Sequence, residues 1–353
     1  MKAIVLVGGE GTRLRPLTYG IPKPMVPVLN YPFLEHTIAY LKKYRIKEAV
    51  LATSYLSEAI QGYFGQLTGL GVKLIYAVED KPLGTAGAVK NAEQHLSDTF
   101  IAFNGDIFTD LNLTKMLAFH RAKAAKVTIA LTRVENPSAY GVVETESDGR
   151  VRRFIEKPSP ELVSRDQVTT NWINAGIYII EPEVLGYMPD NTHYMFESGL
   201  FPLLLQLGEP LYALKFDSGY WLDMGTPRKY LQLNCDLLLS KARSALLGTF
   251  GKDEVRYGER CTVHPSAQII GPVIIGSNCK IGQDVCIKGP VAINSDCSLA
   301  EGVTLETAVL WQGVAIGKNA VLRHTVVGKD TTISANATLL HSAVAGSDIQ
   351  ALN

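Results

Sequence analysis

Residues 269–293 read IIGPVIIGSNCKIGQDVCIKGPVAI, and a large aliphatic side chain recurs there at every sixth position. The same recurrence runs without a miss from Val263 to Leu305 and then continues through two shortened, five-residue steps. The residue four places after each of these positions is usually small or β-branched. A period of six with one large and one small inward position is typical of a hexapeptide β-helix. We therefore expect residues 257–353 to form a left-handed β-helix of about five triangular coils.

Three of the five cysteines follow the same register. Cys261, Cys279 and Cys297 are eighteen residues apart, which is one coil of the expected β-helix, and they fall at small inward positions. A metal site needs converging ligands, whereas these three would form a line with no His in the same position. We interpret them as small hydrophobic core residues. Cys235 and Cys286 show no pairing pattern.

Upstream of residue 236, short apolar runs alternate with helix-length segments. This alternation predicts an α/β domain with a Rossmann-like open sheet, mixed but mostly parallel, and helices on both faces. Ligands of such sheets bind at the carboxyl ends of the strands. The expected strands are residues 3–7, 49–52, 72–78, 100–103, 127–131 and 177–180, and the expected helices include residues 32–44, 85–96 and 114–124.

The charges of the chain balance, with 34 basic and 34 acidic residues. A neutral chain has no net field to attract nucleic acid or an anionic membrane, so bound phosphates must meet a few placed cations. No uninterrupted apolar stretch approaches the ~18 residues of a membrane span. The opening apolar residues 1–7 run into Gly8, Gly9 and then Arg13 without a cleavage-like site. We expect a cytoplasmic protein that binds neither nucleic acid nor a membrane.

A glycine-rich loop, GGEGTRLRP at residues 8–16, follows the first expected strand and its Leu6. No Gly-Lys-Ser/Thr follows, which excludes a Walker A loop. A dinucleotide fingerprint is also excluded, because the last glycine of its Gly-x-Gly-x-x-Gly spacing and the helix that follows it are absent. Glycines that let the backbone approach, followed by Arg13, Arg15 and Lys23, can form a cradle for a triphosphate. An ordinary turn with solvated basic residues is the alternative.

Two aspartates come directly after expected strands. Asp106 follows residues 100–103, and Asp223 follows a short apolar run. Each has a structural alternative, because Asn104-Gly105 is also a hairpin signal and the nearby Thr226-Pro227 is typical of a helix start. Either aspartate taken alone fits its structural alternative.

Together these motifs resemble those of the sugar-1-phosphate nucleotidyltransferase (sugar-nucleotide pyrophosphorylase) family. Residues 8–18 followed by IPKPM at 21–25 look like the signature loop of that family, and its later motifs appear in order. A trailing hexapeptide domain is usual in several branches. The later motifs are PLGTAG at 82–87, NGD at 104–106, EKP at 156–158, NAG at 174–176 and WLDMG at 221–225.

The resemblance, which covers about residues 1–235, implies a role for each motif. Asp106 and Asp223 would ligate Mg²⁺, which typically takes only one or two protein carboxylates. Arg13 and Lys23 would stabilise the triphosphate, and Lys157 would hold the phosphate of the sugar 1-phosphate. Further contacts to the nucleotide would come from Leu6, Gly8, Gly9, Gly11, Thr12, Gly84 and Thr85, and contacts to the sugar phosphate from Gly141, Glu156 and Asn174. The structural alternatives are a helix cap for Thr85 and an exposed ion pair for Glu156 and Lys157.

Such an enzyme joins a nucleoside triphosphate to a sugar 1-phosphate and releases pyrophosphate. The attacking phosphate oxygen is already an anion, so the reaction needs no general base. The obstacle is the repulsion between two polyanions and the charge that grows on the leaving group, which cations relieve.

The context of residues 14–24 and 84–87 looks most like the mannose-1-phosphate guanylyltransferases, which implies GTP and mannose 1-phosphate as substrates and GDP-mannose as product. A glucose-1-phosphate thymidylyltransferase or uridylyltransferase is the main alternative, because base choice rests on backbone contacts and pocket shape.

Two alternatives belong to other classes. A non-catalytic regulatory subunit that binds nucleotide sugars would not need Arg13, Lys23, Asp106, Lys157 and Asp223 together. A second, acyltransferase activity would use a histidine of the repeat, where three occur, but the repeat is short and nearly uninterrupted. The repeat histidines are His264, His324 and His341.

We therefore expect a nucleotidyltransferase catalytic domain over residues 1–235, a linker helix within residues 236–256 and the β-helix over residues 257–353. The flat faces and exposed end coil of a β-helix are natural docking surfaces. A homo-oligomer formed through the β-helix is the expected assembly.

Overall fold

The computed structural model describes residues 1–54, 56–159 and 170–352. The chain forms two compact units, each described here by itself. The first unit contains residues 1–9 and 37–221, and the second contains residues 10–36 and 222–353. The second unit therefore combines the segment that follows Gly9 with the C-terminal part of the chain.

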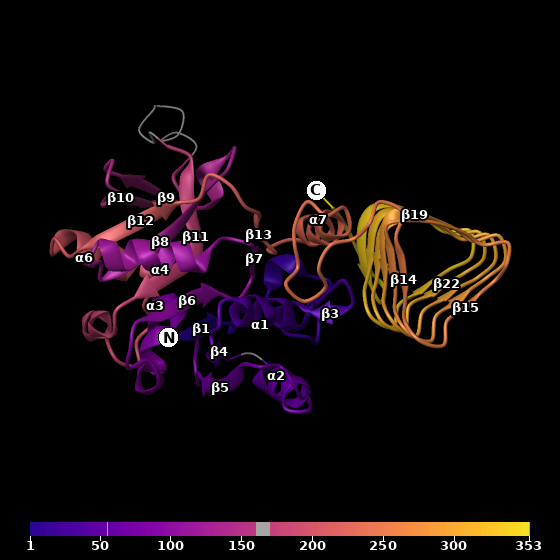
Figure 1. Ribbon diagram of the computed structural model, residues 1–353. Helices are drawn as coiled ribbons and strands as arrows, with labels where there is room; N and C mark the ends of the chain where they lie inside the picture. The colour runs from indigo at the N-terminus through magenta and orange to yellow at the C-terminus, as the bar shows by residue number, and fades with distance from the viewer. Residues whose placement is uncertain (55, 160–169, 353) are drawn as a thin grey trace. The chain divides into compact units, whose positions relative to one another are not determined.

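Within the described residues, the first unit contains a mixed sheet of nine strands (Figure 1). The sequence predicts a mixed sheet but only six of these strands. In one half, β6, β1, β4 and β5 are parallel neighbours. In the other half, β11 is antiparallel to β6, β8 and β9, while β10 pairs with β9 and β12 with β8. The bounds are β1 Lys2–Leu6, β4 Glu48–Thr53, β5 Lys73–Val78, β6 Phe100–Asn104, β8 Val127–Arg133, β9 Gly141–Thr145, β10 Val151–Glu156, β11 Trp172–Ile180 and β12 Leu211–Lys215.

Strands β1, β4 and β6 are buried on both faces, because their sequences are continuous apolar runs, as central parallel strands require. The helices expected at residues 32–44 and 114–124 start and end close to their predicted positions. The helix expected at residues 85–96 ends at Asn91 and is followed by a 3₁₀ turn. Helix α1 begins in the second unit and continues in the first. The helix bounds are α1 Phe33–Lys43, α2 Ser57–Phe64, α3 Gly84–Asn91, α4 Leu113–Ala122 and α6 Phe201–Gln206.

The C-terminal part of the second unit is a parallel β-helix that appears as a triangle in Figure 1. Each strand pairs with the strand one coil later. The longer strands are β14 Val255–Tyr257, β16 Gln268–Ile270, β17 Val273–Ile275, β19 Cys286–Ile293, β21 Thr304–Leu310, β23 Val321–Val327 and β25 Thr338–Ala345, followed by the antiparallel β26 Asp348–Ala351. A second sheet contains β15 Thr262–Val263, β18 Lys280–Ile281, β20 Ser298–Leu299, β22 Ala315–Ile316 and β24 Thr332–Ile333.

The predicted inward register is confirmed, since the large hexad residues from Ile275 to Ile333 share one buried core with Cys279 and Cys297. The thiols of Cys279 and Cys297 donate to backbone oxygens. On the first coil an inward hexad position is partly open to solvent, since Val263 is 36 % exposed.

The corners of the β-helix explain the five-residue steps in the sequence. Ile287 pairs with Leu305, eighteen residues later, but Leu305 pairs with Leu322, only seventeen residues later. The shorter coils turn at single residues with positive φ, Thr307, His324 and His341. The rings of the two histidines stack with centroids 4.7 Å apart.

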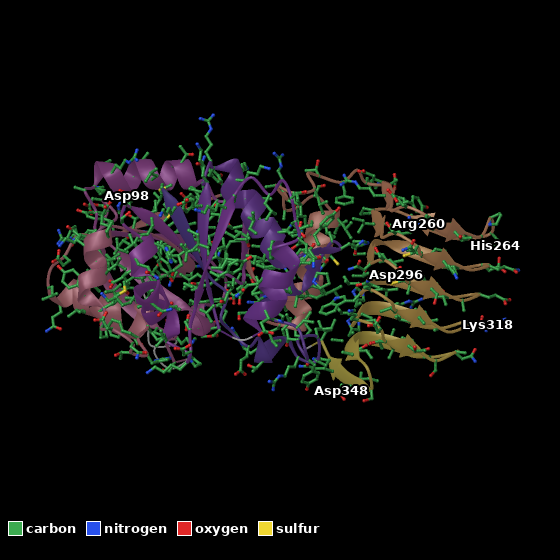
Figure 2. All side chains as sticks on the ribbon, turned by 90° about the horizontal axis from the view of Figure 1, so that it is seen from below. Asp98, Arg260, His264, Asp296, Lys318 and Asp348 are labelled. Atoms are coloured by element: carbon green, nitrogen blue, oxygen red, sulfur yellow. The ribbon has the colours of Figure 1, made fainter. Side chains whose placement is uncertain are left out.

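A polar ladder follows a second corner of the coils. Arg260 Nε donates to Asn278 Oδ1 at 2.8 Å, and Asn278 Nδ2 donates to Asp296 Oδ1 at 2.9 Å. All three residues have positive φ, the conformation in which Asn and Asp are enriched. Figure 2 shows Arg260 and Asp296 along one edge of the stacked coils, and His264 and Lys318 along another.

The predicted position of the linker helix is wrong. Helix α7 spans Pro227–Leu238, and the part of the chain between it and β14 consists of turns. Thr226 caps the helix, since its hydroxyl accepts from Lys229 N, and Pro227 occupies the first turn, as the sequence predicts. The apolar run near residue 238 is therefore the end of an earlier helix. Ser240, with φ 56°, ends it and exchanges hydrogen bonds with the backbone of Phe250.

No helix in the described ranges combines the length and the apolar character needed to cross a membrane.

Candidate active site

The glycine loop leaves the carboxyl end of β1 in the middle of the first unit's sheet. Leu6 is the last residue of β1 and lies beside Asn104 of β6. The Ser54 hydroxyl donates to Gly8 O at 2.6 Å, and a Cβ on Gly8 would lie only 2.8 Å from that hydroxyl. A Cβ on Gly9 would meet no atom within 4 Å. The loop is thus anchored at Gly8 and open at Gly9.

Asp106 lies next to this loop because β6 ends beside β1. Gly105 N donates to Leu6 O at 3.0 Å, and a Cβ on Gly105 would lie 2.5 Å from the same oxygen. Residues 105 and 106 form the turn between β6 and β7 (Ile107–Thr109). The two strands do not pair as a hairpin, so Asn104-Gly105 marks a turn and Asp106 is a carboxylate at the end of a strand.

Asn104 is a residue of this motif that the sequence prediction did not single out. Its Oδ1 is buried and has no hydrogen-bond partner among the described residues. Buried polar atoms in native proteins are usually paired, so an orphaned amide oxygen beside Asp106 suits a ligand or cation. The signal available in the sequence was its place at the end of the same strand.

Thr85 is not a helix cap. Helix α3 begins at Gly84, and the Thr85 hydroxyl donates to Glu197 Oε2 at 3.0 Å and accepts from Phe196 N at 2.8 Å. The backbone amides of Ala86 and Gly87, in the first turn of this helix, donate to Tyr194 O, each at 3.0 Å.

Glu197 is a site residue that the sequence prediction missed. Tyr178 connects it to Asn174, since Asn174 Nδ2 donates to the Tyr178 hydroxyl at 2.7 Å and this hydroxyl lies 3.5 Å from Glu197 Oε1. Burial raises the pKa of the Glu197 carboxyl. The acid therefore connects Thr85 of the predicted nucleotide side with Asn174 of the predicted sugar side. No motif marks it, because it is 112 residues from Thr85.

The predicted sugar side is built where β9 pairs with β10. Gly141 lies opposite Glu156, and a Cβ on Gly141 would lie 2.9 Å from Glu156 Oε2 and 2.6 Å from the Phe154 ring. Lys157 Nζ pairs with Glu156 Oε1 at 3.1 Å. Lys157 has φ 45°, a strained conformation for a residue with a side chain, and its amide donates to Tyr140 O. Such strain is concentrated at functional sites.

Tyr220 and Trp221, the last residues of the first unit before Asp223 in the chain, are hydrogen-bonded within that unit. Thr109 Oγ1 donates to Tyr220 O at 2.9 Å, and Tyr220 N donates to Asp110 Oδ1 at 2.6 Å. The Trp221 indole donates to Ala175 O, next to Asn174, at 2.9 Å. Trp221 is therefore bonded beside the predicted sugar-side residue Asn174.

In the second unit, the rest of the glycine loop lies against Lys23. Gly11 has φ 67°, and a Cβ added there would lie 3.0 Å from Lys23 Cβ. Thr18 Oγ1 donates to Gly11 O at 2.9 Å. Thr12 and Arg13 are exposed in a short 3₁₀ turn, Thr12–Leu14, whereas Lys23 is buried. A second such turn spans Lys23–Met25.

Asp223 belongs to the same unit as these cations. Its carboxylate pairs with the Lys229 ammonium. A Cβ on Gly225 would lie 3.1 Å from Asp223 Oδ2 and 3.6 Å from Arg13 Cζ, so the carboxylate and the guanidinium flank one glycine. Lys229 was not predicted, and its signal was its place in the first turn of the helix after the motif.

The predicted site residues therefore form two groups. Among the described residues, no three His, Cys, Asp or Glu side chains gather to hold a metal. The first unit holds Leu6, Gly8, Gly9, Gly84, Thr85, Asp106, Gly141, Glu156, Lys157 and Asn174, and the second holds Gly11, Thr12, Arg13, Lys23 and Asp223.

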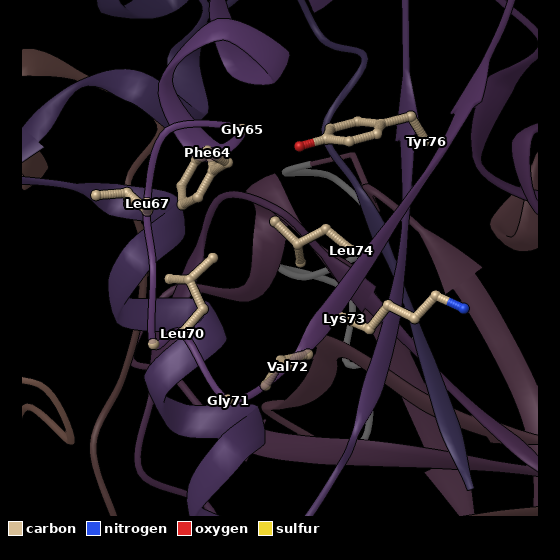
Figure 3. Close-up of a pocket in the computed structure, with 10 residues that line it drawn as sticks. Phe64, Gly65, Leu67, Leu70, Gly71, Val72, Lys73, Leu74 and Tyr76 are labelled. Carbon is tan, nitrogen blue, oxygen red and sulfur yellow. The ribbon is translucent and has the colours of Figure 1, made fainter.

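An open hollow of about 490 Å³ between α2 and β5 lies elsewhere in the first unit (Figure 3). Its walls include Phe64, Leu70, Leu74 and Tyr76. No predicted site residue lines it, so it is not the candidate site.

Comparison with known proteins matches residues 2–240 to the nucleotidyl transferase family model and residues 254–353 to the GMPPB C-terminal domain. The chain is 39 % identical to the mannose-1-phosphate guanylyltransferase of Mycobacterium tuberculosis over 276 residues, or 78 % of this chain and 74 % of that protein. It is 34 % identical to mannose-1-phosphate guanylyltransferase 1 of Arabidopsis thaliana, over 99 % of this chain and 92 % of that protein.

Further similarities are to a uridylyltransferase and to a solved structure. The UTP–glucose-1-phosphate uridylyltransferase of Synechocystis is 36 % identical over 78 % of this chain and 74 % of its own length. A crystal structure of HddC from Yersinia pseudotuberculosis with GMP-PN superimposes with a TM-score of 0.56 and 27 % identity, over 66 % of this chain and 97 % of that one. The chain belongs to the nucleotidyl transferase family and is similar, over nearly its whole length, to mannose-1-phosphate guanylyltransferases.

Proposed function

We propose that this enzyme transfers the guanylyl group of GTP to mannose 1-phosphate, forming GDP-mannose and releasing pyrophosphate. The observation that carries the proposal is the cation group of the second unit, where Gly11, Arg13 and Lys23 share one compact unit with Asp223. This unit supplies positive charge on a glycine-rich backbone, which suits a triphosphate.

We further propose that Asp106 and Asp223 ligate one Mg²⁺. Carboxylate and amide oxygens are the hard donors that Mg²⁺ prefers, and Asn104 Oδ1, orphaned beside Asp106, fits the same chemistry. Asp223 follows by two residues the Trp221 that is hydrogen-bonded to Ala175. Bound there, Mg²⁺ supplies positive charge to the phosphates.

Each candidate site residue then has a role in the proposed reaction. Arg13 and Lys23 neutralise the triphosphate and the departing pyrophosphate. Lys157 holds the phosphate of mannose 1-phosphate for in-line attack, and Glu156 and Asn174 bind sugar hydroxyls. Thr85 binds on the nucleotide side, where Glu197 fixes its hydroxyl.

The experiment is pyrophosphate release with each pair of GTP, dTTP, UTP or ATP and mannose or glucose 1-phosphate. We expect GTP with mannose 1-phosphate to give the highest kcat/KM. Preference for glucose 1-phosphate with dTTP or UTP would instead support the second candidate, which the uridylyltransferase relative at 36 % identity favours. Tight GDP-mannose binding without turnover of any pair would identify a regulatory subunit.

We also propose that two or more copies associate through the β-helix in the cytoplasm. Tyr257 and Ile270 on the first coil, and Leu340 and Ile349 on the last, are each at least half exposed, as apolar contact surfaces are before assembly. The cysteines are free thiols, as expected of a reducing compartment. Light scattering should give a molar mass above that of one chain, and a monomer at micromolar concentration would contradict the assembly.

A further inference from the structure

The segment after Lys23 is hydrogen-bonded to residues of the second unit that are remote from it in sequence. Lys23 begins a 3₁₀ turn, Val26 N donates to Lys23 O at 3.2 Å, and β2 (Pro27–Val28) follows. The Tyr230 hydroxyl of α7 donates to Pro27 O. His36 Nε2 lies 2.9 Å from Val28 O. The backbone that carries Lys23 is therefore fixed from outside its own stretch of sequence.

The next two residues are strained and held in the same way. Leu29 and Asn30 have φ of 46° and 73°, a conformation that residues with side chains rarely adopt. Leu29 N donates to Asn234 Oδ1 of α7 at 2.9 Å, and Asn30 Nδ2 donates to Ile293 O of the β-helix at 2.8 Å. Such a conformation persists only when surrounding structure enforces it.

The β-helix also acts on this segment through α7. The Trp311 indole N–H donates to the Tyr230 hydroxyl at 2.8 Å, and the two rings meet edge to face with centroids 6.1 Å apart. Trp311 is 3 % exposed and Tyr230 is fully buried. Because the indole occupies a lone pair of the hydroxyl, the phenolic proton is directed at Pro27 O. Burial also raises the pKa of Tyr230, which keeps this proton in place.

From these contacts we infer that the β-helix is a positioning element for the triphosphate. Trp311 and Tyr230 form a chain of two hydrogen bonds from the β-helix to Pro27, and this chain sets the place of Lys23. The inference rests on the proposed function, because it takes Lys23 as a triphosphate ligand. It gives the β-helix a role within the catalytic reaction, in addition to any role in assembly.

The test compares Trp311→Phe with Thr325→Val in the full-length protein. Trp311→Phe removes the N–H and keeps an aromatic ring. The Thr325 hydroxyl, also buried in the β-helix, donates within the described part of the chain to Arg323 O and Leu339 O of the same domain. We expect Trp311→Phe to raise the KM for GTP about 3- to 10-fold and to leave the KM for mannose 1-phosphate within about twofold, as for one lost bond in a coupled network. Thr325→Val should change neither KM.

A lower Tm of Trp311→Phe with an unchanged KM for GTP would overturn the inference, since the contact would then be only structural. An equal rise in KM for Thr325→Val would also overturn it. Asn30→Gly is the second variant, because glycine tolerates the positive φ while the bond to Ile293 O is lost. This variant should also raise the KM for GTP.

Binding of inorganic tripolyphosphate, measured by calorimetry, separates this inference from the proposed reaction. Tripolyphosphate needs only the cation group, so Trp311→Phe should weaken its binding whether or not GTP is the true substrate. Weaker binding in the variant combined with no pyrophosphate release by the wild-type protein would refute the reaction and support the positioning role. A wild-type protein that does not bind tripolyphosphate, or a variant with unchanged affinity, would overturn the positioning role.

Discussion

The two groups of site residues are held in different ways. In the first unit, Asp106, Gly141 and Glu156 lie at strand ends whose register is set by neighbouring strands of one sheet. In the second unit, Lys23 lies on a strained segment that depends on α7 and on the β-helix, nearly 300 residues away in sequence at Trp311. A sheet edge places side chains through local register, whereas a loop of cations needs support from distant elements.

Variants that remove a charge from the candidate site should have the largest effect on kcat. Asp106→Asn should lower kcat for pyrophosphate release about 10²-fold or more, because the carboxylate proposed to bind Mg²⁺ becomes a neutral amide, and Arg13→Ala should have a similar effect. Asp98→Asn is the matched control, since Asp98 is an exposed carboxylate of the same unit (Figure 2). Rates near wild type for both site variants would refute these assignments.

The strand-end group should be sensitive to backbone space. Gly105→Ala places a methyl 2.5 Å from Leu6 O and 2.7 Å from a Val7 methyl, so β1 and β6 must separate. We expect a loss of about 1–3 kcal/mol in the free energy of unfolding, measured by urea denaturation, together with lower activity. Gly9→Ala, where the added methyl meets nothing within 4 Å, should change stability little. Equal stability of the two variants would contradict the packing described for β1 and β6.

Glu197 offers a finer test, because it joins the two sides of the first unit's group. Glu197→Gln leaves one acceptor oxygen for the two hydroxyls of Thr85 and Tyr178. It should lower kcat/KM about 10-fold, with higher KM for both substrates. Glu93→Gln is a control at an exposed acid. A change confined to Tm, with both KM values unchanged, would show that Glu197 only packs.

His36 supports the segment after Lys23 and should make the free energy of unfolding depend on pH. His36 bonds to Val28 O and to Ser244, and burial lowers its pKa from 6.5 to about 4. The unfolded chain therefore binds the proton first, so this contribution is fully present above pH 6.5 and declines as the pH falls toward 4. We expect the free energy of unfolding to fall by about 1–2 kcal/mol between pH 7 and pH 5 through this histidine. His36→Gln should reduce the slope of unfolding free energy against pH; an unchanged slope would remove His36 as the cause.

The sequence predicted both architectures for identifiable reasons. The hexad positions from Ile275 to Ile333 are buried in one core, because a strict period of six leaves only one inward register. The short strands β1 and β6 were predicted from apolar runs, and the glycines at 8, 105 and 141 proved to be positions where a Cβ would collide.

What the sequence could not predict depends on contacts between remote residues. Glu197 meets Thr85 only after the chain has folded, and no local pattern marks it. The same holds for Trp311 and Tyr230, and for Lys229 beside Asp223. The linker helix was misplaced because the apolar run near residue 238 ends an amphipathic helix that Thr226 and Pro227 begin.

We propose above that Asp106 and Asp223 ligate one Mg²⁺. The most direct measurement is kcat for pyrophosphate release, from GTP and mannose 1-phosphate with Mg²⁺, in Asp106→Asn, Asp223→Asn and the double variant. Groups that act as a unit are strongly non-additive. We predict that the double variant is no slower than the slower single variant, within about threefold. Losses that multiply in the double variant, or a single variant with the wild-type rate, would contradict the account.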